Sequence, residues 1–452
     1  MGSRGASSCV SRPAREAHPR AGGGDLRLTV VAVGSRGDVQ PYVGLAAGLA
    51  AAGMDVTVAT HGPFRALVEG RGLAFAALRS DPQAAMATAA GQAWVASSRN
   101  PVTFVARMVG LALEAGEDLG EDVLAATEGA EGLVYSPLGL AAFHVAEARR
   151  VPAVPAFLAP ASPTRAFASP VQPLASLGPL NPLTHRAAAA AFDRPFRRRI
   201  NRWRRDHLGL APIRGRNPYL AAAAAGAPVL YGFSPRVVPV PADWGAGAHV
   251  TGYWTLPPDP SWRPPPVLVD FLAAGPAPVY AGFGSMGVAE PGRLARTVVA
   301  AARRARRRLV LGRGWAGLEA GGDDVLVVDD VPHEWLFPRS AGVVHHGGAG
   351  TTAAALRSGV PSLACPFFAD QFFWARRAAA LGVGPAPLRA RALDAERLGL
   401  ALLRLTGPAH RTRGAAVGTA LRAEDGVAAA VAVLRRVLSA PRGRGRPSSS
   451  TW

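Results

Sequence analysis

Residues 343–352 read VVHHGGAGTT and join a short apolar run to the expected start of a helix. The valines predict a buried strand, and the glycines predict a tight turn. The first amides of the next helix lack intrahelical partners and carry the positive end of its dipole, so this turn suits a diphosphate. The alternative is a glycine-rich turn with two ordinary histidines, because such turns are common.

Short apolar runs alternate with helical patterns on both sides of this turn. One series contains a strand at residues 279–283, and an earlier series contains a strand at 26–33, a helix that includes Pro41 and a strand at 56–59. The stretch between the two series, residues 236–266, is rich in proline and glycine and predicts a linker. Two such series predict an α/β protein with two doubly wound, Rossmann-like domains.

The expected organisation follows from this alternation. We expect a disordered leader at residues 1–25, an N-terminal domain at 26–235, the linker at 236–266, a C-terminal domain at 267–438 and a disordered tail at 439–452. Ligands of parallel sheets bind beyond the carboxyl ends of the strands, so two facing domains are expected to share one cleft.

A second polar segment, PFFADQ at residues 366–371, follows the expected strand at 361–365. Asp370 and Gln371 together accept and donate hydrogen bonds, which suits the vicinal hydroxyls of a sugar ring. The alternative is a solvated turn, in which these residue types are common.

Residues 282–287, GFGSMG, fit the dinucleotide pattern G-x-G-x-x-G. That interpretation needs an acidic residue about twenty positions later to bind ribose, and the segment LGRGW at 311–315 supplies none. We therefore expect Gly284 and Ser285 to approach a donor phosphate from the opposite side of the cleft. A P-loop is absent, and Asp329-Asp330 fits a turn, so we expect neither a metal nor another cofactor.

Asp38 follows the first strand, in the sequence GSRGDVQP at residues 34–41. A carboxylate there could accept the proton of an alcohol as a bond to a sugar forms, provided that it lies within hydrogen-bonding distance. Its position before Pro41 equally fits a helix cap, and the sequence leaves base and cap open.

The composition is that of a globular protein, with 49% hydrophobic and 18% charged residues and a formal net charge of +19. Dense arginine runs occur at residues 197–205 and 303–308. The first run fits a solvated helix face, with peripheral contact to anionic lipid as the alternative, and no nucleic-acid recognition module accompanies either run. With two cysteines, Cys9 and Cys365, and no membrane span, we expect a cytoplasmic location, with membrane contact at most peripheral.

Four motifs in this order, at residues 34–41, 331–338 (VPHEWLFP), 345–352 and 366–374, resemble UDP-dependent sterol 3-beta-glucosyltransferases and their relatives that glycosylate glycopeptide and macrolide antibiotics. The resemblance covers about residues 26–434. It implies the two-domain GT-B fold, an inverting transfer and no required metal.

The resemblance also implies a role for each matched position. Asp38 would be the general base, and Asp370 and Gln371 would hold the hydroxyls of the transferred sugar. The donor would further be held by His345, Gly348, Gly350 and Thr351 at the diphosphate, by the segment from Val331 to Trp335 at the uracil, and, less firmly matched, by Ser285.

The predicted function is transfer of a hexose, glucose by preference, from a UDP-sugar to a hydroxyl of a hydrophobic acceptor such as a sterol, a hopanoid or another lipid. The alternatives are an antibiotic glycosyltransferase, a UDP-sugar epimerase or hydrolase, and a non-catalytic nucleotide-sugar-binding protein. Apolar residues of the segment 80–196 could line the acceptor pocket or belong to the core. They are Trp94, Phe104, Met108, Phe157 and Phe167. The sequence leaves the sugar, the acceptor and the oligomeric state open.

Overall fold

A computed structural model describes residues 26–96, 103, 106–107, 109–110, 118–215 and 217–439. The expected leader, residues 440–452 of the expected tail, and Phe104 and Met108 lie outside these ranges.

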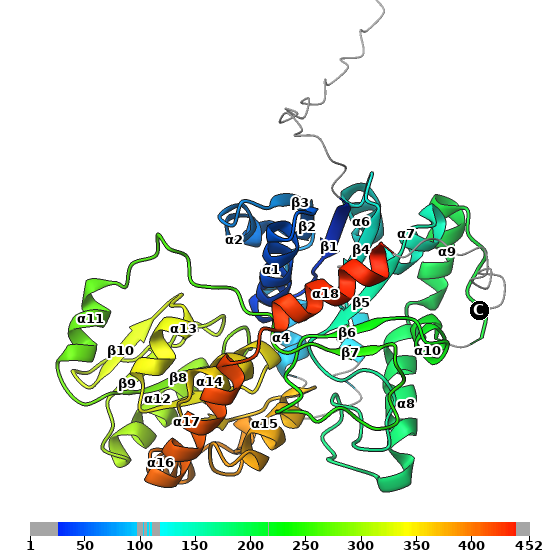
Figure 1. The fold of residues 1–452 in the computed structure, drawn as a ribbon. Helices are drawn as coiled ribbons and strands as arrows, with labels where there is room; N and C mark the ends of the chain where they lie inside the picture. Colours follow the sequence, from blue (N-terminus) through cyan, green and yellow to red (C-terminus); the bar gives the residue numbers. More distant parts are fainter. Residues whose placement is uncertain are drawn as a thin grey trace, which may run out of the picture.

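Two parallel sheets organise the chain (Figure 1). The N-terminal sheet has the order β3-β2-β1-β4-β5-β6-β7, and the C-terminal sheet has the order β10-β9-β8-β11-β12. The strands of the first sheet are β1 (Arg27–Val31), β2 (Asp55–His61), β3 (Ala74–Leu78), β4 (Gly132–Tyr135), β5 (Ala153–Phe157), β6 (Val229–Tyr231) and β7 (Ala248–Val250). Those of the second are β8 (Val279–Gly282), β9 (Leu309–Gly312), β10 (Val325–Val328), β11 (Gly342–His345) and β12 (Ser362–Ala364).

Helices connect the strands and cover the sheets, as parallel sheets require. In the N-terminal half they are α1 (Arg36–Ala51), α2 (Arg65–Glu69), α3 (Pro82–Ala87), α4 (Ala89–Ala96), α6 (Leu119–Ala126), α7 (Ala141–Arg149), α8 (Asn181–Asp193), α9 (Arg197–Leu208) and α10 (Pro218–Ala224). In the C-terminal half they are α11 (Pro266–Ala273), α12 (Pro291–Arg304), α13 (His333–Leu336), α14 (Ala349–Ser358), α15 (Gln371–Ala380), α16 (Ala395–Leu405), α17 (Pro408–Arg422) and α18 (Gly426–Leu438). Short 3-10 turns are η1 (Gly62–Phe64), η3 (Gly178–Leu180), η4 (Phe337–Arg339) and η5 (Ala390–Ala392).

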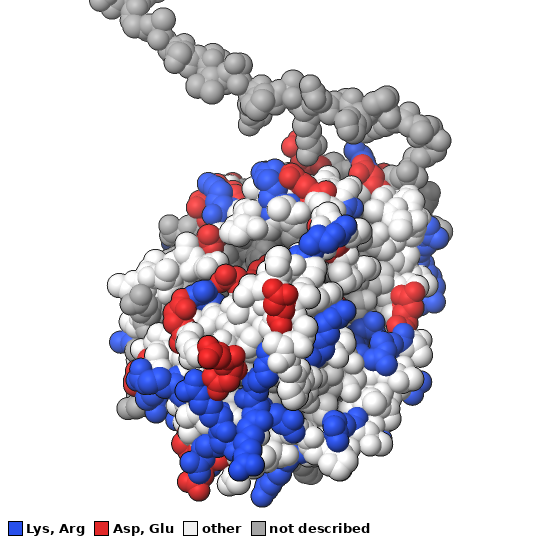
Figure 2. All heavy atoms as spheres, turned by 90° about the vertical axis from the view of Figure 1, so that its left-hand side faces the viewer, with Lys and Arg blue, Asp and Glu red and all other residues white. Residues whose placement is uncertain are grey.

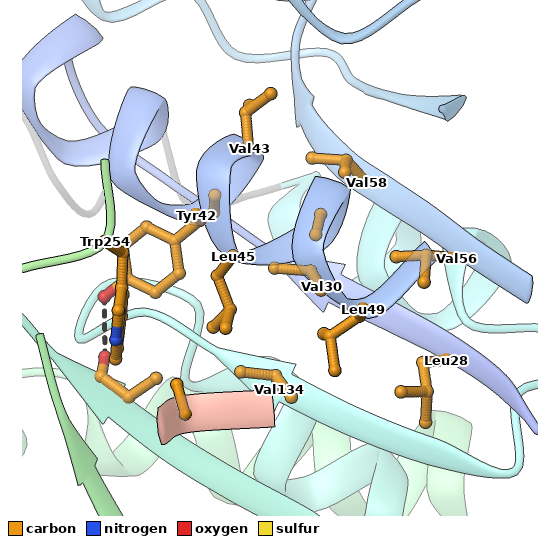
Figure 3. Packing of buried hydrophobic residues seen from close by; sticks show 14 of the residues in the cluster. Leu28, Val30, Tyr42, Val43, Leu45, Leu49, Val56, Val58, Val134 and Trp254 are labelled. Atoms are coloured by element: carbon orange, nitrogen blue, oxygen red, sulfur yellow. Dashed lines mark hydrogen bonds between the residues drawn. The ribbon is translucent and has the colours of Figure 1, made fainter. Parts of the chain in front are cut away.

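The core of the N-terminal domain fixes α1 on the sheet (Figure 3). Leu45 and Leu49 of α1 pack on Val30 and its neighbours in the sheet. The Tyr42 ring meets the Trp254 ring edge-on at 5.6 Å between centroids, and the Tyr42 hydroxyl donates to the Ala156 carbonyl at 2.6 Å. These contacts hold the N-terminus of α1, and therefore Asp38, in a fixed place.

The last helix, α18, crosses back from the C-terminal half and lies against α1 (Figure 1). Its buried residues Val431, Leu434 and Leu438 belong to the core of the N-terminal domain. The sequence prediction had placed this segment in the C-terminal domain, because an apolar helix face does not reveal which core it joins.

The prediction of two facing Rossmann-like domains is confirmed. The strand β7 lies inside residues 236–266, which the sequence predicted as a linker, and it pairs in parallel with β6. A three-residue strand among prolines and glycines is too short to give a recognisable period. Within the described residues no helix is both long and apolar enough to cross a bilayer.

If α18 is part of the N-terminal core, Leu434→Ala should lower the free energy of unfolding by about 2–5 kcal/mol, since it empties a fully buried site. Leu403, which is exposed on α16, provides the matched control Leu403→Ala. Chemical denaturation measures both variants. Equal stabilities of the two variants would contradict the placement of α18.

Candidate active site

A cleft of about 1580 Å³ separates the two domains and is lined by both. Most of the residues expected to form the site lie on its walls: Asp38, Ser285, Val331, Gly348, Gly350, Thr351, Asp370 and Gln371. The cleft therefore brings together residues from five separate segments of the chain.

Two helix N-termini converge in this cleft. Helix α14 begins at Ala349 and has no side-chain cap, so its first amides remain available to a ligand. Gly350 lies against the N-terminus of α1: a Cβ atom at Gly350 would lie 3.2 Å from the carbonyl oxygen of Gly37. Because both dipoles point their positive ends here, the cleft favours an anion at this place.

Asp38 both caps α1 and lines the cleft. The Ser35 amide and the Ser35 hydroxyl each donate to Oδ2 of Asp38 at 2.9 Å. Both hydrogen bonds are to Oδ2 and neither involves Oδ1, so Oδ1 remains available to accept a proton. Solvent reaches part of the residue, yet desolvation by the cleft walls raises the pKa of the carboxyl, an effect that the Ser35 hydrogen bonds oppose. Cap and base are therefore compatible roles for one side chain.

His61, which the sequence prediction overlooked, supports the turn that carries Asp38. Its Nε2 accepts from the Gly34 amide at 3.0 Å, while Nδ1 lies 2.6 Å from the Ser80 carbonyl and donates to it. Burial lowers the pKa of His61, which favours the neutral form that this pairing needs. Gly34 itself adopts φ +136, and a Cβ atom there would lie 2.7 Å from Oδ2 of Asp38. The only feature of the sequence that points to this role of His61 is its place, as a polar residue, at the end of an apolar strand.

Asp370 lies close enough to Asp38 for the two carboxylates to interact. Desolvation first, and the charge of Asp38 second, raise the pKa of Asp370 to about 6, whereas a hydrogen bond of 3.0 Å from the Trp374 indole opposes the shift. Gln371 is more occupied: its amide oxygen accepts from the Phe367 amide at 2.8 Å. Asp370 is therefore the more available partner for a ligand hydroxyl.

The two histidines of residues 343–352 lie in different places. His345, expected at the diphosphate, is fully buried beneath the turn, where its Nδ1 accepts from the Gly347 amide at 3.1 Å. His346 lines the cleft instead, between Gly284 and Gly348. Burial lowers the pKa of His345 to about 3 and that of His346 to about 4, so both are neutral at neutral pH. The strand alternates sides at each residue, and the sequence alone did not reveal which histidine faces the cleft.

The segment from Val331 to Trp335 is divided in a similar way. Val331 and Glu334 line the cleft, whereas Trp335 packs edge-on against Trp262, with 5.4 Å between ring centroids, and under the Arg339 guanidinium. Trp335 thus supports the segment from behind rather than forming the cleft wall.

Charged residues that the sequence prediction had not assigned to the site also meet here. Arg36 of α1 forms an ion pair with Asp330 across the cleft, so Asp330 is more than a turn residue. Burial raises the pKa of Glu334, while the charges of Arg36 and Arg357 oppose that shift. These charged residues stand in or beside the matched motifs, but their residue types alone did not assign them to the site.

The N-terminal wall of the cleft is partly apolar. Phe64, Leu67 and Met86 line it, and so does Trp94, for which the sequence had left pocket and core open. Phe157 and Phe167 instead pack in a hydrophobic cluster, so they belong to the core.

Among the residues that the structure describes, no group of three or more histidine, cysteine, aspartate or glutamate side chains could hold a metal ion.

The comparisons with known proteins agree with this geometry. Residues 28–168 match the glycosyltransferase family 28 N-terminal domain, and residues 313–430 match the C-terminal domain of erythromycin biosynthesis protein CIII-like proteins. Sterol 3-beta-glucosyltransferases are similar in sequence: one from Cryptococcus neoformans var. neoformans is 37% identical over 444 residues, and one from Emericella nidulans is 35% identical over 434 residues. These alignments cover 91% of this chain but 27% and 30% of the relatives, so the chain spans less than a third of their length.

Solved structures share the fold. The glycosyltransferase of kitacinnamycin superposes with a TM-score of 0.68 at 21% identity and covers 93% of this chain and 100% of its own. The glycosyltransferase VinC, solved in complex with dTDP, gives 0.62 at 22% identity and covers 91% and 99%. The GT-B fold is thus confirmed, as is the resemblance to sterol and antibiotic glycosyltransferases.

The raised pKa of Asp370 makes a prediction about stability. A carboxyl whose pKa is higher in the folded state stabilises the fold below its unfolded pKa and loses that contribution as the pH rises through about 6. Asp370→Asn should therefore stabilise the protein at pH 8 by roughly 3 kcal/mol and have almost no effect near pH 3. Denaturation across this range measures the difference, with exposed Asp55→Asn as the control. A pH-independent difference would contradict the shift.

Proposed function

We propose that this chain, which carries a glycosyltransferase family 28 N-terminal domain, transfers a hexose from a UDP-sugar to a hydroxyl of a hydrophobic acceptor with inversion at the anomeric carbon. The observation that carries the proposal is the placement of Asp38 and Asp370 beside two converging helix N-termini in one cleft. The sequence relatives favour a sterol or a similar lipid as the acceptor.

The donor binds the C-terminal wall. Its diphosphate lies at the free amides of α14, near Gly348, Gly350 and Thr351, where the dipole balances its negative charge without a metal. His346, being neutral, contributes a hydrogen bond rather than a charge. Ser285 approaches from the opposite turn, and Asp370 accepts from hydroxyls of the sugar.

The acceptor binds the apolar N-terminal wall. Its hydroxyl oxygen forms a bond to the anomeric carbon while Asp38 takes the hydroxyl proton. The bond between that carbon and the phosphate oxygen breaks, and UDP leaves with the electron pair. The amides of α14 stabilise the charge that develops on the leaving group.

Transfer to an antibiotic-like acceptor is the second candidate, favoured by the fold of the kitacinnamycin enzyme. Incubating the protein with UDP-glucose and a panel of sterols, hopanoids and macrolides, followed by mass spectrometry, separates the two. A donor-only incubation tests the epimerase and hydrolase alternatives, because they convert the donor without an acceptor.

A pair of variants separates the base from the cap. Asp38→Asn keeps an oxygen that can accept from Ser35 but removes the base, so kcat should fall by about 10²–10⁴-fold while UDP affinity stays within about twofold. Ser35→Ala removes one capping bond and keeps the carboxylate, so kcat should fall far less. Steady-state kinetics and calorimetric titration with UDP measure both. If Asp38→Asn keeps its turnover, Asp38 is not the base.

A further inference from the structure

An exposed apolar ridge lies outside the cleft, on the loop and helix that follow β5. Its members recur at every third position: Leu174, Leu177, Leu180 and Leu183 are 48%, 42%, 55% and 53% exposed. Leu177 directly precedes η3, Leu180 ends it, and Leu183 lies in the first turn of α8, where residues three apart share a face. Figure 1 shows α8 and the loop before it at the lower right, projecting below the N-terminal sheet.

Buried polar side chains hold this ridge in shape. Asn181 is 1% exposed; its side-chain oxygen accepts from the Leu177 amide at 2.6 Å, and its side-chain nitrogen donates to the Arg165 carbonyl at 2.8 Å. Thr184, also buried, accepts from the Ser169 amide at 2.8 Å. These hydrogen bonds fix the loop from its buried side, so the exposed leucines keep a fixed arrangement. Their contact with water is unfavourable.

The ridge is also tied to the C-terminal domain. Arg376 of α15 donates to the Pro173 carbonyl at 2.8 Å and to the Leu174 carbonyl at 3.2 Å. Helix α15 starts at Gln371, on the cleft wall. The ridge therefore has a fixed position relative to the candidate active site.

The charges around the ridge are almost all positive. Between residues 150 and 205 the only acidic residue is Asp193, which forms an ion pair with Arg197. Asp243 lies beneath the loop, where Thr164 and the Arg165 amide donate to it. The exposed cations that continue from the ridge along α8 and α9 are Arg186, Arg194, Arg198 and Arg202, whereas Arg205 is paired with Asp206.

We propose that this ridge docks the protein on an anionic lipid membrane, with the leucines inserted at the interface and the arginines on the lipid headgroups. Aliphatic residues in one row, continued by cations without free acids, match an interfacial anchor. Protein interfaces instead favour tyrosine, tryptophan and methionine at their centres. Docking is independent of the proposed reaction and would bring the cleft to a surface in which apolar acceptors dissolve.

Cosedimentation of the full chain with vesicles tests the docking without any substrate. Binding should be strong on phosphatidylcholine vesicles that contain phosphatidylglycerol, weak on phosphatidylcholine alone, and reduced by salt. The triple variant Leu177→Ser, Leu180→Ser, Leu183→Ser should bind at least about tenfold more weakly. Its matched control is Leu400→Ser with Leu403→Ser, because these leucines of α16 are 53% and 51% exposed on the C-terminal domain, and this double variant should bind like the parent protein.

A third variant tests the electrostatic part. Arg186→Gln, Arg198→Gln and Arg202→Gln together should remove most of the preference for phosphatidylglycerol. Chemical denaturation confirms that each variant is folded. Parent-like vesicle binding by the leucine variant would overturn the proposal, as would a parent protein that binds no vesicles but forms a dimer that the leucine variant loses.

Discussion

The amino ends of α1 and α14 meet across the cleft, with the backbone of Gly350 against that of Gly37. Two positive helix ends at one place repel each other unless an anion or solvent lies between them. Side chains larger than glycine would hold the helices apart at this contact. The glycine contact, the Arg36–Asp330 ion pair and the return of α18 to α1 all bring the domains to this point.

The same convergence explains the electrostatics of the acidic residues. Asp38 and Asp370 both lie in the crowded wall of the cleft, and each makes ionisation of the other less favourable. Ser35 offsets part of this cost at Asp38, and Trp374 does so at Asp370. The neutral histidines add no positive charge, so the attraction for an anion comes from the helix ends and from arginines that line the cleft, among them Arg36 and Arg357.

The positive charge of the chain is spread unevenly over its surface. On the face drawn in Figure 2, basic side chains gather in the lower part, with acidic ones among them. Several basic side chains of the C-terminal domain are paired with acidic ones, as in the Arg303–Asp324 ion pair. This pairing differs from the leucine ridge, where the exposed arginines have few acidic neighbours, and it agrees with solvated helix faces for the run at residues 303–308.

The fold was predictable from the sequence because strand and helix periods, glycine turns and the order of four motifs all agree. The cleft residues followed from the same turns, since parallel strands bring their carboxyl ends to one edge. Other features depend on packing between distant segments. The histidine that faces the cleft depends on the pleat of β11, the place of Trp335 depends on Trp262, and His61 acts only through a turn 27 residues away. The core that α18 joins could be known only in three dimensions.

Calorimetric titration with UDP and with uridine, in the presence and absence of EDTA, tests the role of the helix ends most directly. If the α14 amides hold the diphosphate, UDP binds equally well with and without EDTA, and uridine binds at least about a hundredfold more weakly. UDP affinity that disappears with EDTA and returns with Mg²⁺ would contradict that role, as would equal affinities for UDP and uridine.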